Sequence, residues 1–215
     1  MLKKAVLFDM DGVLIDSEPV YAQCLSMAFA ARGVHIPQEE FYPLAGLEFR
    51  EKFQLIIQQQ GLQLNADELA DPYREVQRQL LTDFGPMLRP GAVSLLHWLR
   101  ERGCSTALCS NSNQERVGKV FHDTGMGELF DVVVTGEFVP KRKPDPGVYL
   151  MGLELLGLPP EQCTAVEDSA FGIQAARRAG LTVVAFQDPR FPAWAERADK
   201  SIDSLPQLKQ IWEEL

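Results

Sequence analysis

Two aspartates separated by one residue, Asp9 and Asp11, follow a short apolar run near the start of the chain. The run, residues 5–8, is bounded by charge and glycine, and it predicts a buried strand of a parallel sheet. Because a strand places alternate residues on the same side, both carboxylates are expected to leave its end in similar directions. Buried carboxylates repel each other, and a bound cation would relieve that cost. The alternative is a strand followed by an ordinary polar turn.

Further polar side chains follow later predicted strands or lie in the loop between two of them: Ser110, Asn111, Lys143, Glu167 and Asp168. Each set alone has an ordinary explanation, such as a helix cap, a solvated charged loop, or acids that match the dipole of the next helix. Together, acids on two strands with a hydroxyl and a lysine between them are typical of a hard-cation site that faces an oxyanion site.

These residue types can be combined into one reaction, phosphoryl transfer. Mg²⁺ prefers oxygen ligands, and Asp9 and Asp168 can supply carboxylates, with the backbone carbonyl of Asp11 as a third oxygen. Asp9 can attack phosphorus as a carboxylate nucleophile, while Mg²⁺, Lys143 and Ser110 stabilise the charge of the transition state. Asp11 can protonate the leaving oxygen and later deprotonate the water that cleaves the aspartyl-phosphate.

The remainder of the chain predicts the elements that must position these groups. No convincing strand lies between Ser17 and Pro86, where apolar residues follow helical spacing, so a helical block is inserted directly after the first strand. From residue 89 onward helices and short strands alternate, which implies an α/β fold with a parallel sheet covered on both faces. In such sheets, ligands bind beyond the carboxyl ends of the strands. The expected strands are 5–8, 105–109, 131–134, 163–166 and 182–186.

Composition restricts the class of protein and of partner. With 215 residues, 46% of them hydrophobic, the chain suits one large domain or a core with a modest insertion, and no apolar run could span a bilayer. The net charge of −9 argues against a nucleic-acid partner or an anionic membrane surface. The four cysteines lack metal-ligand spacing and are typical of core residues in a reducing compartment. We therefore expect a cytoplasmic protein without a signal peptide, and a monomer by default.

Four segments resemble, in the same order, the motifs of the haloacid dehalogenase-like hydrolase superfamily. They are DMDGVLIDSE from Asp9, the serine that ends TALCS, the lysine of KPDP, and VEDSAFGI from Val166. The resemblance implies a Rossmann-like parallel sheet core, residues 1–17 and 89–215, with an α-helical cap domain inserted at 18–88. It also implies a Mg²⁺-dependent phosphatase that acts on a small phosphorylated metabolite, such as a sugar phosphate, through an aspartyl-phosphate.

The resemblance also implies a role for each matching residue. Asp9 matches the nucleophile, Asp11 the acid/base, and Lys143 the charge-stabilising lysine. The phosphate-binding residues would be Ser110, Asn111 and Lys143, and the metal-binding residues would be Asp9, Asp11, Glu167 and Asp168. In the helical block, Glu18 at the cap hinge and Arg50 are candidates for substrate contact. Their alternative roles are a helix-dipole partner and a surface arginine, respectively.

Relatives in this superfamily catalyse other reactions, so alternatives stay open. The true dehalogenases lack the second aspartate of the first motif, and Asp11 argues against that reaction here. Sugar-phosphate phosphatases and β-phosphoglucomutases share this cap type, and no residue decides between hydrolysis and mutase chemistry. A non-catalytic binding module on the same fold is a third possibility, because a fold does not fix a function.

Overall fold

The computed structural model describes residues 3–45, 47–191 and 197–215. The chain forms two compact units. The α/β unit comprises Met1–Asp16, Phe84–Pro189 and Ala193–Leu215, and the helical unit comprises Ser17–Asp83 with Arg190–Pro192. The segment 84–88, expected in the inserted block, belongs to the α/β unit because Asp16 N–H donates to Met87 O and Ile15 pairs with Leu88.

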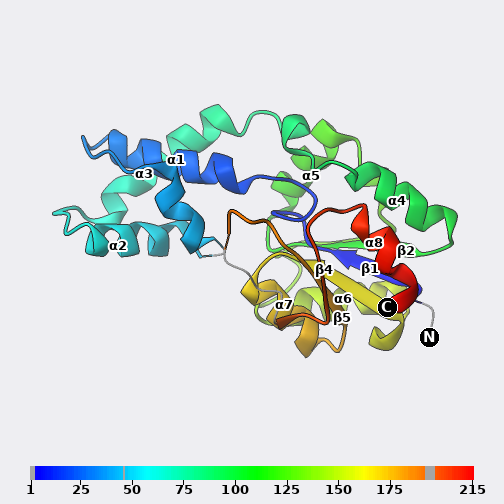
Figure 1. Ribbon diagram of the computed structural model, residues 1–215. Helices are drawn as coiled ribbons and strands as arrows, with labels where there is room; N and C mark the ends of the chain where they lie inside the picture. Colours follow the sequence, from blue (N-terminus) through cyan, green and yellow to red (C-terminus); the bar gives the residue numbers. More distant parts are fainter. Residues whose placement is uncertain (1–2, 46, 192–196) are drawn as a thin grey trace. The chain divides into compact units, whose positions relative to one another are not determined.

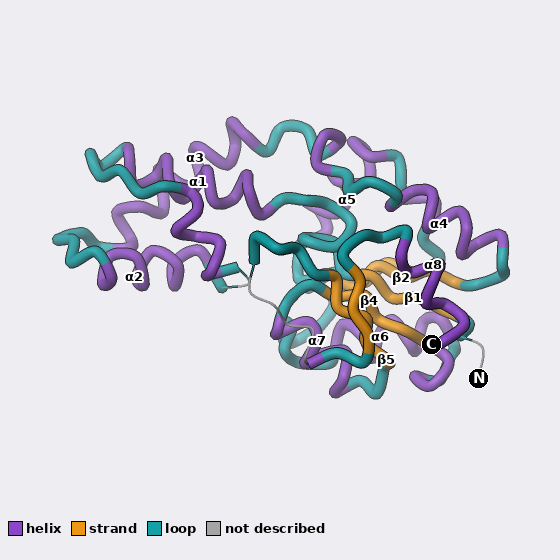
Figure 2. Tube along the Cα trace, viewed as in Figure 1, coloured by secondary structure: helices purple, strands orange, loops and turns teal. Residues whose placement is uncertain are grey.

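A parallel sheet of six strands forms the centre of the α/β unit, in the order β3-β2-β1-β4-β5-β6 (Figure 2). The strands are β1 Ala5–Phe8, β2 Ser105–Cys109, β3 Val132–Val134, β4 Cys163–Glu167, β5 Thr182–Phe186 and β6 Lys200–Ile202. The five predicted strands are confirmed, whereas β6 was missed, because only Ile202 of its three residues is apolar and buried. β1 pairs with β2 on one side and β4 on the other, so all four of its residues are buried.

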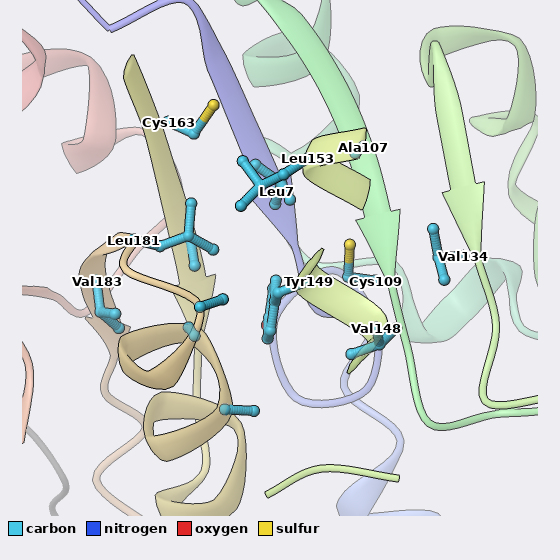
Figure 3. Packing of buried hydrophobic residues seen from close by; sticks show 14 of the residues in the cluster. Leu7, Ala107, Cys109, Val134, Val148, Tyr149, Leu153, Cys163, Leu181 and Val183 are labelled. Atoms are coloured by element: carbon cyan, nitrogen blue, oxygen red, sulfur yellow. The ribbon is translucent and has the colours of Figure 1, made fainter. Parts of the chain in front are cut away.

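Helices cover both faces of this sheet. They are α4 Ala92–Glu101, α5 Gln114–Thr124, α6 Gly147–Leu156, α7 Ala170–Arg178 and α8 Gln207–Ile211. Figure 1 shows α6 and α7 on one face and α4, α5 and α8 on the other. Ala5 and Leu7 of β1 pack in one cluster with residues of α6 and α7, as Figure 3 shows for Leu7 and Tyr149. Val6 and Phe8 are not part of this cluster, because successive side chains of a strand point to opposite faces of the sheet. Packing on both faces therefore fixes the orientation of β1 and the direction in which the chain leaves its C-terminal end.

Helix α6 lies unusually close to the sheet at Gly152. A Cβ atom at this position would lie 2.9 Å from Cys109 Sγ and 3.0 Å from a methyl carbon of Leu7, both of which are fully buried. The four cysteines are buried free thiols, as expected of core residues. Close packing at Gly152 therefore sets the distance between α6 and the strands that carry the polar groups.

The described residues of the helical unit form three helices, α1 Glu18–Ala30, α2 Phe49–Gln59 and α3 Ala66–Leu80, and a 3-10 segment, Gln38–Leu44. The rings of Phe29 and Phe53 meet edge to face, with centroids 5.5 Å apart, in its core. Helix α3 ends at Leu80, and Phe84 N–H donates to Asp123 of the α/β unit. None of the helices in the described part of the chain has both the length and the apolar character that crossing a bilayer requires.

The close contact at Gly152 yields a stability prediction. Gly152→Val is expected to lower the free energy of unfolding by about 1–3 kcal/mol, because the added methyl groups overpack a filled core. The matched control is Gly118→Ala in α5, where a Cβ atom meets nothing within 4 Å and the backbone φ is ordinary. That change is expected to raise stability by about 0.5–1 kcal/mol through helix propensity. Urea unfolding measures both, and a neutral Gly152→Val would contradict the packing argument.

Candidate active site

The end of β1 and the end of β4 meet at the centre of the sheet. Asp9 directly follows β1, and its N–H donates to Val166 O of β4, so the pairing of the two strands continues up to the aspartate. Glu167 ends β4 and is fully buried, and Asp168 follows it. Strand order runs outward in opposite directions from β1 and β4, and ligands bind at such a switch point in open α/β sheets.

Lys143 joins these two strand ends. Its Nζ donates to Asp9 Oδ1 at 2.5 Å and to Glu167 Oε1 at 2.6 Å, and its side chain is almost completely buried. Tyr149 of α6 donates its hydroxyl to the same Glu167 oxygen at 2.6 Å. Lys143, a candidate from the sequence, thus lies between Asp9 and Glu167, and Tyr149 holds the Glu167 carboxylate that the lysine contacts.

Burial and charge act in opposite directions in this group. Burial raises the pKa of Asp9 to about 7, even though the Lys143 ammonium opposes the rise, and the Glu167 carboxylate adds to it. Burial alone would lower the pKa of Lys143, but the Asp9 and Glu167 carboxylates outweigh it and raise that pKa above its ordinary value. The lysine thus stays charged, and Asp9 is a carboxylate that needs positive charge nearby to ionise fully.

Three carboxylates converge at this point. One oxygen from each of Asp9, Glu167 and Asp168 lies within 4.8 Å of the others. Two glycines provide the room: a Cβ atom at Gly12 would lie 1.8 Å from Asp168 Oδ2, and one at Gly172 would lie 2.0 Å from the Glu167 carboxyl group. A set of hard oxygen donors with excess negative charge, kept open by glycine, fits a divalent cation such as Mg²⁺.

Asp11 has different partners from Asp9. Its carboxylate accepts hydrogen bonds from Ser112 Oγ at 3.0 Å and from Arg116 Nη2 at 2.5 Å, and both donors follow β2. Its side chain is not part of the group of three carboxylates. A metal ligand from Asp11 is therefore best supplied by its backbone carbonyl, while its side chain is held in one orientation by the β2 loop and α5.

Ser110 and Asn111 lie at the end of β2. The Ser110 hydroxyl is buried and accepts a hydrogen bond from Ser112 N–H at 3.1 Å. Asn111 Oδ1 accepts a hydrogen bond from Lys143 N–H at 2.9 Å. Asn111 thus fixes the backbone of the loop that carries the lysine, a role that its sequence position beside Ser110 did not reveal.

Arg89 holds the loop after β1. Its Nε donates to Gly12 O at 2.8 Å, and its Nη2 contacts Asp188 at 3.0 Å and Asp16 at 3.4 Å. Sequence reasoning missed Arg89, Arg116 and Tyr149, because an isolated arginine resembles a surface residue and an aromatic residue in a helix resembles core. Only their contacts with the motif residues identify them.

The two candidates in the helical unit lie on neighbouring helices. Glu18 begins α1, and its carboxylate lies 3.4 Å from the buried ammonium of Lys52 in α2. Arg50, also in α2, pairs with Asp67, and both side chains are more than half exposed. The Glu18 carboxylate is therefore held in place by Lys52. The ion pair of Arg50 with Asp67 is exposed to solvent, and pairs of this type contribute little to stability.

Comparisons with known proteins agree with this geometry. The sequence profile of haloacid dehalogenase-like hydrolases matches residues 3–180. The chain belongs to the haloacid dehalogenase-like hydrolase family. This match confirms the family predicted from the four motifs, and the sheet order confirms the α/β fold class.

Individual relatives of this hydrolase are named for phosphate chemistry. A phosphorylated carbohydrates phosphatase from Thermotoga maritima is 30% identical over 180 residues, which cover 83% of this chain and 82% of that protein. The crystal structure of a CbbY mutant from Rhodobacter sphaeroides in complex with xylulose-(1,5)bisphosphate has a TM-score of 0.72 at 26% identity and covers 96% of both chains. A β-phosphoglucomutase from Clostridium difficile has a TM-score of 0.76 at 21% identity, over 99% of this chain and 98% of that one, which concerns the fold alone. The phosphatase names support the prediction of a phosphoric monoester hydrolase.

The contact between Arg116 and Asp11 yields a prediction about turnover. Arg116→Met is expected to lower kcat about 10–100-fold with little change in KM, because Asp11 loses the partner that orients its carboxylate. Arg116→Lys should recover part of the loss. Steady-state kinetics with a phosphorylated substrate, together with thermal unfolding of each variant, measures the effect.

The control for this prediction is Lys119→Met, one turn further along α5. Both Arg116 and Lys119 place their cations against the ring of Phe84, but Lys119 pairs with Asp123. Lys119→Met is therefore expected to keep its kcat. Equal losses in the two variants would assign Arg116 to packing and not to the orientation of Asp11.

Proposed function

We propose that this hydrolase is a Mg²⁺-dependent phosphatase that removes the phosphoryl group of a small metabolite through an aspartyl-phosphate on Asp9. The observation that carries the proposal is the convergence of the Asp9, Glu167 and Asp168 carboxylates beside the buried ammonium of Lys143. An acidic group of this kind binds a phosphate only when cations offset its charge, and the fixed lysine supplies one of them. The relatives named as phosphatases support the same reaction class.

The residues that would hold Mg²⁺ are Asp9, Asp168 and the backbone carbonyl of Asp11, with Glu167 as a ligand or as the acid that anchors Lys143. When bound, the ion would neutralise phosphate oxygens and the Asp9 carboxylate at once. The buried Asp9, whose pKa is raised by its surroundings, would thereby remain an ionised nucleophile.

The first half of the reaction uses the first motif. An oxygen of the Asp9 carboxylate forms a bond to phosphorus in line with the breaking bond to the leaving oxygen. Asp11, in its protonated form, gives its proton to that leaving oxygen, and the alcohol departs. The Lys143 ammonium and the Ser110 hydroxyl donate hydrogen bonds to the equatorial oxygens, where charge is spread in the transition state.

The second half releases phosphate and restores the enzyme. Asp11, now a carboxylate, takes a proton from a water molecule, whose oxygen attacks phosphorus. The bond between phosphorus and the Asp9 oxygen breaks, and inorganic phosphate is released with Asp9 ionised again. Ser112 and Arg116 donate hydrogen bonds to the Asp11 carboxylate and hold it in one orientation.

We also propose that the helical unit is the cap that selects the substrate. Its candidates for substrate contact remain Glu18 and Arg50, and Asn111 serves the phosphate by fixing the Lys143 loop. A mutase of the β-phosphoglucomutase type would use the same groups but would pass the phosphoryl group from Asp9 to a second sugar phosphate. The substrate panel described below separates the two reactions.

The nucleophile assignment predicts the effect of Asp9→Asn. The amide keeps the size of the side chain, and Lys143 keeps its bond to Glu167, so the variant is expected to fold. Its turnover is expected to fall about 10³-fold or more, because no carboxylate oxygen remains to attack phosphorus. Normal turnover of the purified variant would remove Asp9 from this role.

The metal and substrate assignments are tested by phosphate release from a panel of phosphorylated metabolites, with Mg²⁺ or with EDTA. We expect release from one or a few sugar phosphates with Mg²⁺ and loss of release with EDTA, since Asp9 needs the charge of the cation. Activity that persists in EDTA would contradict the metal assignment. Conversion of β-glucose 1-phosphate to glucose 6-phosphate with a trace of glucose 1,6-bisphosphate, and little free phosphate, would indicate the mutase.

A further inference from the structure

A second concave site lies on the outer side of α7, in the α/β unit. The cavity has a volume of about 570 Å³, within the range of small-molecule sites. Its described lining is Ala170, Phe171, Ile173, Gln174, Arg177, Arg178 and Arg197. None of the reacting carboxylates, nor Lys143, belongs to this lining, so the phosphatase chemistry makes no use of the cavity.

Positive charge is concentrated in this cavity. Three of its seven described lining residues are arginines, and none of the seven is acidic, although the chain as a whole has a net charge of −9. Arg177 and Arg178 also suit the C-terminal end of α7, where cations stabilise the helix dipole. The dipole accounts for two cations on this helix, but it does not account for a hollow surface or for the third arginine, which comes from another segment.

The guanidinium groups are held in place by backbone oxygens. Arg177 Nη1 donates to Arg197 O at 2.7 Å, and Arg178 Nη1 donates to Pro144 O at 3.0 Å. Each guanidinium carries five N–H donors, and each of these two contacts uses one of them. The Arg177 guanidinium, oriented by its bond to Arg197 O, matches the oxygens of a phosphate, since two parallel hydrogen bonds can form with little further ordering.

The remaining lining is apolar or amide. Phe171 is 44% exposed, and Ala170 lies beside it in the chain. An aromatic ring next to arginines favours a ligand that combines a flat apolar part with an anionic part. Inorganic phosphate would leave most of a cavity of this volume empty.

We propose that this cavity binds a small organic phosphate of nucleotide size, with Arg177 and Arg178 on its phosphate and the ring of Phe171 against its flat part. Arg178 links the cavity to the reaction site, because the carbonyl that it holds belongs to Pro144, the residue after Lys143. A phosphate that draws Arg178 toward the cavity weakens this bond and loosens the lysine loop. Occupancy is therefore expected to lower turnover.

Binding is tested by calorimetry on the full chain in EDTA, with the non-hydrolysable nucleotide α,β-methylene-ADP as the probe. We expect Arg177→Gln to weaken its binding about tenfold, because a charged hydrogen bond to the phosphate is lost. Adenosine, which lacks the charge, and methylenediphosphonate, which lacks the flat part, should each bind more weakly than the complete probe. Equal binding of the probe to the wild type and to Arg177→Gln, or no binding to either, would overturn the proposal.

Arg100→Gln is the matched control. Arg100 is also an exposed arginine near the C-terminal end of a helix, α4, and it donates to a backbone oxygen, Glu128 O, at 2.8 Å. It lies outside the described lining of the cavity. The probe should bind to this variant as it does to the wild type, and an equal loss in both variants would assign the effect to net charge.

The proposed effect of cavity occupancy on turnover is measured separately, by steady-state kinetics. This measurement rests on the proposed phosphatase activity. With saturating substrate, the probe is expected to lower kcat of the wild type about fivefold and to leave kcat of Arg177→Gln unchanged. A rise in KM alone would mark competition at the reaction site and would overturn the link. Calorimetry needs no turnover, so failure of the cavity and failure of the phosphatase assignment are distinguishable.

Discussion

The buried ion pairs of Lys143 are the interaction on which the rest of the site depends. Two carboxylates from two central strands would repel each other in a water-poor pocket, and the ammonium between them makes their coexistence possible. Removing one partner of such a group leaves a buried charge without compensation, which is far more costly than losing a surface pair. The lysine loop therefore has to be fixed as firmly as the strands, and Asn111 and Arg178 hold it by its backbone.

Two glycines, Gly12 and Gly172, leave the space that the Asp168 and Glu167 carboxylates occupy. Gly12 lies where a Cβ atom would overlap the Asp168 carboxylate, and Gly172 lies where one would overlap Glu167. The φ of Gly12, +82°, also lets the chain turn directly after the first motif. The two glycines of the motifs are thus part of the site, because they let two acids approach the backbone closely enough to converge with Asp9.

The sequence predicted the elements and residues whose signals are local. The apolar runs of the five predicted strands and the four motif segments can be recognised without knowledge of distant contacts, and Asp9, Glu167 and Lys143 do converge. The sequence did not predict that Arg116 binds Asp11 across 105 residues of chain, because no local pattern encodes that contact. The edge strand β6 was missed because it depends on pairing with β5 and not on an apolar run of its own.

The parallel pairing of β1 with β2 and β4 has a consequence for folding of the chain during its synthesis on the ribosome. The strand that carries Asp9 is made first, but its partners begin at Ser105 and Cys163, so it must wait for most of the chain before both its edges are covered. During this time an apolar segment with exposed backbone edges is a target for aggregation and for chaperones. Because Glu167 and Asp168 emerge later still, a nascent chain holds Asp9 long before it holds the acids that converge with it. The long separation of β1 and β4 in the sequence thus delays the convergence of the three carboxylates until β4 has been made.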